Sequence, residues 1–213
     1  MNVIDAMNRR RTTEYFEPDG LLLSRDEIEK LIADACLSPS EFNLQPWRFI
    51  VVRDLARKEI LYECTDHQEK IRNAVAVLIL CGDSMAFQSV DDMARSRVEA
   101  ECLREEEVAE FCRLVTARYE KSKWERALLA VRNPAFAGMS LMLLALERGI
   151  ASAPIFSFSE EAIRRSFHIQ PRFLPVMLIA LGLPSTHGAQ PSRGPRVDTK
   201  SVVFHEDMAA MEF

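Results

Sequence analysis

Three arginines stand next to one another near the start of the chain, Arg9, Arg10 and Arg11, and two threonines follow them. Two further arginines, Arg193 and Arg196, lie between glycine and proline residues near the other end. Guanidinium groups grip phosphate through paired hydrogen bonds, and hydroxyl groups suit the same ligand. The two segments could therefore form a site for a terminal phosphate. The alternative is a solvated basic face, which charge clusters commonly form.

The second candidate is the segment 38–47, which reads SPSEFNLQPW. Two prolines and a tryptophan would hold its polar side chains in a rigid rim, and such a rim can hydrogen-bond a flat heteroaromatic ring. The alternative is an ordinary turn, in which serine and asparagine side chains satisfy backbone groups and Trp47 joins the core. The residues alone leave both interpretations open.

The sequence shows no arrangement for nucleophilic or metal-assisted catalysis. The four histidines, at positions 67, 168, 187 and 205, form no HExxH motif and no paired-ligand spacing, so we expect no metal site. The glycines form neither GxGxxG nor GxxxxGK, so a nucleotide would have to be held in another way. We expect no catalytic residue of the protein itself.

Composition narrows the class of protein. A chain of 213 residues with 48% apolar and 28% charged residues fits one folded domain over residues 1–213. A formal net charge of -5 argues against nucleic acid as a partner. The N-terminus lacks the apolar core of a signal peptide, and the most apolar stretch, 135–146, ends in charge, so we expect no membrane span. Five cysteines without a CxxC pair suggest a reducing, cytoplasmic compartment.

Local patterns predict the elements that position these residues. Ser24 and Glu27 form a capping-box pattern ahead of a helix over 25–36, and Asp54 can cap a second helix. Apolar runs predict buried strands at 48–52, 74–81, 150–155 and 174–181, with a helix opening at Ser159 between the last two. A possible further strand covers 201–204.

The middle of the chain is helical. Apolar residues recur every three or four positions between about 85 and 131, which predicts two amphipathic helices. Asn133 and Pro134 suit the N-cap and first position of a new apolar helix, which Gly149 would end. Together these elements predict an α+β domain with a mixed sheet covered by helices.

Several of these segments together resemble the nitroreductase family of FMN-dependent oxidoreductases. The resemblance covers nearly the whole chain and rests on these segments: Arg10-Arg11-Thr12 with Phe16, Pro39-Ser40-x-x-Asn43-x-Gln45-Pro46-Trp47 before a strand, Gln68-x-x-Ile71-x-x-Ala74, Glu147 to Ile150, Pro154 to Ser157, and Arg193-x-Pro195. The resemblance implies a mainly antiparallel central sheet and a homodimer with two FMN sites at the subunit interface. It also implies a C-terminal segment that extends onto the partner subunit.

The resemblance also implies roles for single residues. The FMN phosphate would be held by Arg10, Arg11, Thr12 and Arg193. The isoalloxazine ring would be lined by Pro39, Ser40 and Asn43 of the other subunit. Lys70 would approach the N1/O2 edge of the flavin ring. The N5 and O4 atoms would face the backbone of Pro154, Ile155, Phe156 and Ser157. Asn133 would touch the ribityl chain, unless it caps a helix instead.

Several positions depart from the family pattern, among them His67, which stands where an amide side chain is common. Glu14 stands where the family usually has arginine or lysine, so Arg9 or Arg196 would have to compensate. Phe156-Ser157 replaces a turn that usually contains glycine. The segment 88–130 shapes substrate access in this family and points to no one substrate here.

The resemblance implies an enzyme that takes a hydride from NAD(P)H onto FMN and reduces small nitroaromatic or quinone-type acceptors by a ping-pong mechanism. One alternative is a specialised family reaction, such as reductive dehalogenation or ring oxidation. The other is a non-catalytic flavin-binding or regulatory protein. The tail after Arg196 gives independent, weaker support for the homodimer, because it carries the apolar residues Val202, Val203, Phe204, Met208, Met211 and Phe213. The alternative is that the tail folds back on its own subunit.

Overall fold

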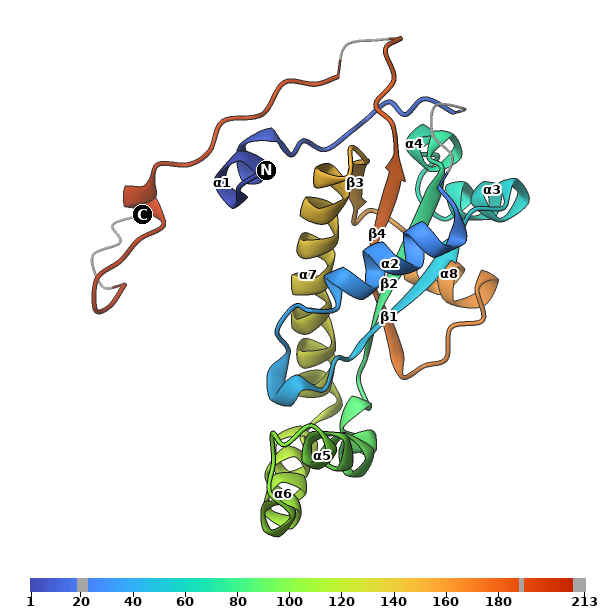
Figure 1. Cartoon of the computed structure of the whole chain (residues 1–213). Helices are drawn as coiled ribbons and strands as arrows, with labels where there is room; N and C mark the ends of the chain where they lie inside the picture. The colour runs from blue at the N-terminus through green and yellow to red at the C-terminus, as the bar shows by residue number, and fades with distance from the viewer. Residues whose placement is uncertain (19–22, 188–189, 209–213) are drawn as a thin grey trace.

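A four-stranded sheet lies between two layers of helices in the computed structural model, which describes residues 1–18, 23–187 and 190–208 (Figure 1). The strands, in spatial order, are β1 (Trp47–Val52), β2 (Ala76–Asp83), β4 (Phe173–Gly182) and β3 (Ala151–Ile155). Every pairing between them is antiparallel. The predicted α+β class and antiparallel character are confirmed, and no parallel pair accompanies them in the described part of the chain.

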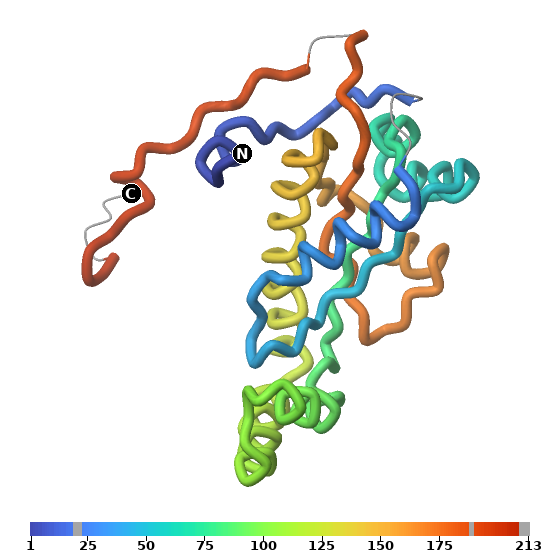
Figure 2. Tube along the Cα trace, in the orientation of Figure 1, coloured from blue at the N-terminus to red at the C-terminus, as the bar shows by residue number. Residues whose placement is uncertain are grey.

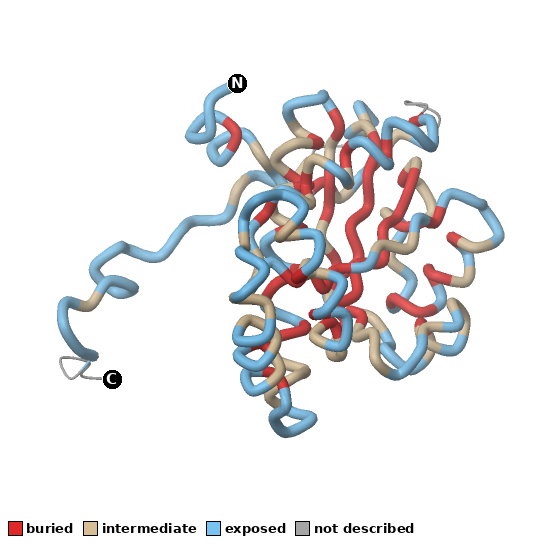
Figure 3. Tube along the Cα trace, turned by 60° about the horizontal axis from the view of Figure 1, so that its bottom comes forward, coloured by how far each residue is buried: buried red, intermediate tan, exposed pale blue. Residues whose placement is uncertain are grey.

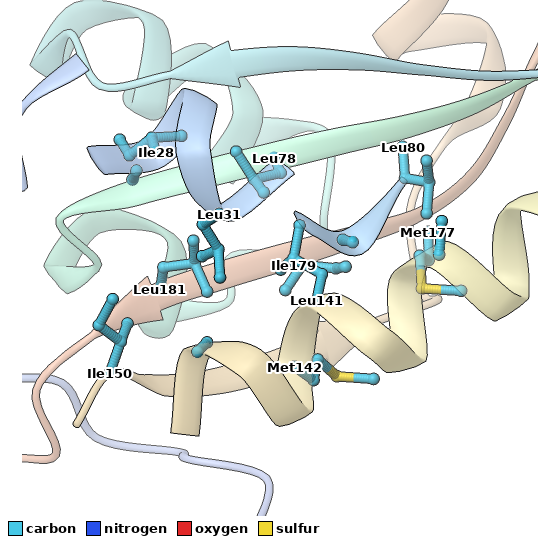
Figure 4. Packing of buried hydrophobic residues seen from close by; sticks show 14 of the residues in the cluster. Ile28, Leu31, Leu78, Leu80, Leu141, Met142, Ile150, Met177, Ile179 and Leu181 are labelled. Atoms are coloured by element: carbon cyan, nitrogen blue, oxygen red, sulfur yellow. The ribbon is translucent and has the colours of Figure 1, made fainter. Parts of the chain in front are cut away.

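The sheet is buried on both faces, because its apolar runs alternate between two clusters. Leu78 and Leu80 of β2 face α2 (Arg25–Ala35) and α7 (Lys123–Glu147), as Figure 4 shows. Val77 and Ile79 face the opposite layer, formed by α3 (Leu55–Glu63), α4 (Glu69–Asn73) and α8 (Glu160–Ser166). The helices on both faces explain why the strands read as continuous apolar runs rather than alternating ones.

Three helix starts follow the capping patterns of the sequence. Ser24 accepts from the backbone N–H of Glu27 while the Glu27 side chain bonds back, which completes the capping box of α2. Asp54 caps α3 and Ser159 caps α8 through their side chains. The predicted amphipathic pair is α5 (Val90–Glu99) and α6 (Val108–Tyr119). The helices α1 (Val3–Arg9) and α4 complete the set.

The predicted helix start at Asn133 is wrong. α7 begins at Lys123, after a capping box at Ser122, and Pro134 lies inside the helix. A proline has no N–H for the carbonyl of Ala130, one turn earlier. That carbonyl lies against Gly82 of β2, where an added Cβ would stand 1.6 Å from the oxygen. The absence of a side chain at Gly82 gives this carbonyl room beside β2.

The predicted strand at 201–204 is also wrong. Residues Thr199–Ser201 form a single turn of 3-10 helix, and Val202 and Val203 are exposed. A β-branched run forms a strand only where a neighbouring strand supplies hydrogen bonds. The C-terminal segment extends away from the sheet and its helices, as Figure 3 shows. Two apolar residues of the predicted tail, Met211 and Phe213, lie outside the described residues.

The central helix α7 is long and apolar enough to cross a membrane by length and composition alone. In this fold, however, Ala137, Leu141 and Ala145 are buried against the sheet. α7 is therefore a core helix that joins both ends of the molecule.

We expect the cysteines to differ sharply in reactivity. Burial raises the pKa of the Cys81 thiol to about 11, so little thiolate forms at pH 8, whereas Cys102 is exposed. Iodoacetamide at pH 8 should modify Cys102 and leave Cys81 unmodified until urea unfolds the chain. Peptide mass spectrometry reads both sites, and equal modification of the two in the folded protein would contradict the burial described here.

Candidate functional site

The arginine segments from the two ends of the chain meet around one cavity. The cavity has a volume of about 210 Å³ and is lined by Arg10, Arg11, Thr12, Glu14, Pro191, Ser192, Arg193, Gly194 and Arg196. Arg193 holds the two segments together, because its Nη2 donates to the backbone oxygens of Met7 and Arg10 at 2.6 and 2.8 Å. An adjoining cavity of about 260 Å³ adds Arg9. The structure thus brings Arg10, Arg11, Thr12 and Arg193 together, with Arg196 as a further member.

Positive charge dominates this cavity. Burial, and then repulsion by Arg11, Arg196 and Arg10, lowers the pKa of the Arg193 guanidinium. The carboxylate in the cavity wall, Glu14, accepts a hydrogen bond from Lys70 Nζ at 2.6 Å. A bound anion would relieve the repulsion among the arginines, which identifies the cavity as a candidate anion site.

Lys70 and the turn after β3 adjoin the same region. Thr13 N donates to the carbonyl of Ser152 in β3, so the segment after the arginines runs beside that strand. Gln68, at the start of α4, donates from Nε2 to the carbonyl of Ser157 at 3.2 Å. The contacts therefore link the arginine cavity, α4 and the end of β3 into one surface region.

Within that turn the predicted residues differ in what they present. Pro154 and Ile155 pair with Ile179 and Leu178 of β4, and the Ile155 side chain is buried in the core. Phe156 and Ser157 follow the last residue of β3, and Phe156 is 65% exposed. Only these last two residues are beyond the strand ladder and exposed to a ligand.

Pro39 and Ser40 line a separate cavity of about 660 Å³ against α7, whereas Asn43, in the same loop, is not among its lining residues. The backbone of this loop is unusual, because Phe42, Asn43 and Gln45 all have positive φ. Ser40 Oγ accepts from Gln45 N at 3.0 Å, which closes the turn. The segment is a shaped loop and not an extended linker.

The side chain of Asn133 links this loop to α7 by hydrogen bonds. Its Oδ1 accepts from the backbone N–H of Glu41 at 2.9 Å, and its Nδ2 donates to the carbonyl of Leu129 at 2.9 Å. Asn133 lies in the interior of the α7 sequence, its side chain is buried, and it caps no helix. The structure therefore corrects the N-cap interpretation and gives Asn133 a positioning role.

Within one chain the two halves of the predicted site line different cavities. Arg10 lines a cavity that includes Leu146 at the C-terminal end of α7. Pro39 lines one cavity with Asn133 and another with Leu144 and Glu147. In Figure 2 the N-terminal segment lies near the C-terminal end of α7, and the loop after α2 lies farther down that helix. None of these cavities is lined by both Arg10 and Pro39.

Sequence reasoning missed a set of contacts that fixes the loop to the α5–α6 pair. Arg118 Nε donates to Glu41 Oε1 at 2.8 Å, and the Tyr119 hydroxyl donates to Glu41 Oε2 at 3.3 Å. Burial raises the pKa of Tyr119, and the Glu41 carboxylate raises it further. The partners are 77 and 78 residues apart in sequence, so no local pattern could reveal them.

Comparison with known proteins agrees with this fold. The family model “Nitroreductase family” matches residues 7–183. The chain is similar to “Putative NAD(P)H nitroreductase MhqN” of Bacillus subtilis, with 29% identity over 186 residues, 87% of this chain and 90% of the relative. It is 30% identical to “NADH dehydrogenase” of Thermus thermophilus over 194 residues, 89% of this chain and 90% of that protein.

A solved structure shows the same architecture. A chain from Exiguobacterium sibiricum 255-15, crystallised in complex with FMN, matches with a TM-score of 0.88 and 22% identity, covering 97% of this chain and 98% of that one. The family match runs from the last turns of α1 to the end of β4 and so includes both the sheet and most of the candidate site. The chain therefore belongs to the nitroreductase family.

Proposed function

We propose that this chain is an FMN-dependent oxidoreductase that accepts hydride from NAD(P)H and reduces small nitroaromatic or quinone-type acceptors by a ping-pong mechanism. The observation that carries the proposal is the cavity in which four arginines, Arg10, Arg11, Arg193 and Arg196, converge with a threonine hydroxyl. This donor set suits a phosphate monoester. Membership of the nitroreductase family and the FMN bound to the similar Exiguobacterium chain support FMN as the ligand.

The arginines and Thr12 fit the phosphate end of such a cofactor. Arg10, Arg11 and Arg193 would supply charge-assisted bonds, with Arg196 in the position to compensate for Glu14. Glu14 is itself neutralised by Lys70, so it does not cancel the field of the arginines. The departure at Glu14 is therefore compatible with phosphate binding.

The remaining predicted residues would orient the ring system. Lys70, which keeps two N–H donors beside its bond to Glu14, would approach the N1/O2 edge. The backbone N–H groups of Phe156 and Ser157, beyond the ladder of β3, would face N5 and O4. The Oδ1 atom of Asn133 keeps a second lone pair for the ribityl chain beside its bond to Glu41 N. When bound, FMN supplies the hydride-transfer chemistry, and the residues of the chain bind and orient it.

We further propose a homodimer in which each site is shared. The arginine cavity of one chain would hold the phosphate, and Pro39, Ser40 and Asn43 of the other would line the ring. Arg10 and Pro39 line different cavities within one chain, which supports this arrangement. Exposed apolar side chains on α1, on α7 and in the tail would be buried in the contact; they include Val3, Ile4, Val131, Val202 and Val203. The chain would act as one domain in the cytoplasm.

Truncation after Asp198 tests the dimer. The variant loses Val202 and Val203, so we expect monomer or aggregate that no longer retains flavin, as measured by sedimentation velocity and by the ratio of flavin to protein absorbance. Leu114→Ser on α6, which removes an exposed apolar residue elsewhere, should leave both measurements unchanged. A full-length protein that sediments as a monomer with stoichiometric FMN would rule out the shared site.

The activity is tested by mixing the yellow holoprotein with NADH or NADPH under anaerobic conditions and following the flavin absorbance. We expect bleaching by one or both nucleotides, followed by recovery of the colour with nitroaromatic or quinone acceptors. An absence of bleaching would favour a non-catalytic flavin-binding protein. Recovery only with halogenated substrates, or bleaching only by an oxidisable ring substrate, would favour a specialised family reaction.

A further inference from the structure

The cavity beside Pro39 and Ser40 contains Asn133, which like them is proposed to contact FMN, and also lining residues that have no role in FMN binding. One wall is the loop with Ser40 and Glu41, and the other is formed by Arg118 of α6 and by α7 residues. Its volume in one chain is about 660 Å³, which the flavin ring and a small organic molecule would share. Because Pro39 and Ser40 are the residues proposed to line the flavin ring, a molecule in this cavity would lie next to the ring.

The two arginines of the cavity differ in their partners. Arg118 is bound to Glu41 through Nε and Oε1 at 2.8 Å. Arg132 is exposed, and it makes no hydrogen bond or ion pair with any residue that the structure describes. Two guanidiniums and one carboxylate give the cavity a formal charge of +1. The unpaired charge is the guanidinium of Arg132.

Apolar surface lies beside this guanidinium. Ala135 and Phe136 follow Arg132 by three and four residues on α7, so the three side chains share one face of the helix. Phe136 is 54% exposed, and Leu129 forms the buried floor. A cation at one end of an exposed apolar wall suits a ligand with a flat apolar body and one anionic group.

We propose that this cavity binds the electron acceptor and that Arg132 selects acceptors that carry a single carboxylate. The inference rests on the proposed function, because the acceptor is defined by the flavin beside it. The Glu41 carboxylate and the formal charge of +1 favour a monocarboxylate over a phosphate dianion, such as the 2′-phosphate of NADPH. Glu41 holds Arg118 away from the ligand and leaves Arg132 to make the specific contact.

The test compares 4-nitrobenzoate with its neutral methyl ester as acceptors for the FMN-loaded protein. In Arg132→Gln we expect kcat/KM for 4-nitrobenzoate to fall about tenfold or more, through KM, with no change for the ester, because only the carboxylate uses a charge-assisted bond. Arg132→Lys should restore part of the preference. Arg95→Gln, which removes an exposed charge paired with Asp92 on α5, is the matched control and should behave as wild type.

A binding measurement accompanies the kinetics. Benzoate, which is not reduced, should bind the oxidised holoprotein in calorimetry, and its Kd should rise about tenfold or more in Arg132→Gln. The proposal is overturned if Arg132→Gln lowers kcat/KM equally for 4-nitrobenzoate and its ester, or lowers it for neither. It is also overturned if the substitution raises KM for NADPH but not KM for NADH. Dissociation of the dimer in Arg132→Gln would make Arg132 a subunit contact instead. If benzoate binds but neither acceptor restores the flavin colour, the proposed function fails and the carboxylate site stands.

Discussion

Gly82→Ala is expected to prevent stable folding of the chain. A Cβ at this position would stand 1.6 Å from the oxygen and 2.6 Å from the carbon of the Ala130 carbonyl. Those atoms belong to the backbone of α7, so relief requires α7 to move away from the sheet that it covers. Overpacking by flexible side chains already costs about 1–3 kcal/mol, and we expect this clash to cost at least about 3 kcal/mol.

The loss of stability is measured by urea unfolding, followed by far-ultraviolet circular dichroism. We expect Gly82→Ala to unfold at a lower midpoint concentration of urea, or to be insoluble on expression. Gly194→Ala is the matched control, since no atom lies within 4 Å of an added Cβ there. It should change the free energy of unfolding of the apoprotein by less than about 0.5 kcal/mol. A Gly82→Ala protein with the wild-type midpoint would show that α7 and β2 do not approach as described.

Arg193→Glu should weaken FMN binding at least about tenfold. The substitution removes one charge-assisted donor and puts a carboxylate among Arg10, Arg11 and Arg196, next to the phosphate. A bond to a charged group is worth ~1.5–3 kcal/mol, and 1.4 kcal/mol corresponds to a factor of ten. Arg193 also ties its loop to the carbonyls of Met7 and Arg10, so the cavity loses shape as well as charge.

Titration of apoprotein with FMN, followed by flavin fluorescence, gives the dissociation constants. Arg126→Glu makes the same change of charge in α7, where the guanidinium donates to the Lys121 carbonyl. It should bind FMN as tightly as the wild type. Equal affinities of the two variants would place the phosphate away from the arginine cavity.

The helices and strands that depend on neighbouring residues in the sequence could be predicted from the sequence. The caps at Ser24, Asp54 and Ser159 and the apolar runs of the four strands identified most of the central layers. The pairing of Arg10 to Thr12 with Arg193 was predicted from residue chemistry and family resemblance, although the segments are far apart in sequence.

The failures have causes outside the local sequence. Asn133-Pro134 is typical of a helix start because proline breaks the hydrogen-bond ladder. The capping box that starts α7 lies eleven residues earlier, at Ser122, and the contact of the Ala130 carbonyl with Gly82 comes from a distant strand. Val202 and Val203 have strand-forming side chains and no neighbouring strand in the described part of this chain. The bond between Glu41 and Arg118 depends on how α6 folds back on the loop.

The division of Arg10 and Pro39 between different cavities of one chain has a kinetic consequence. The sheet and its covering helices lie within residues 25–182, so a chain can complete its core before its terminal segments find a partner. On the proposed shared site, a folded single chain carries the phosphate half of one site and the ring half of another. Tight cofactor uptake would then follow encounter of two chains, and after dilution or refolding its rate would rise with protein concentration.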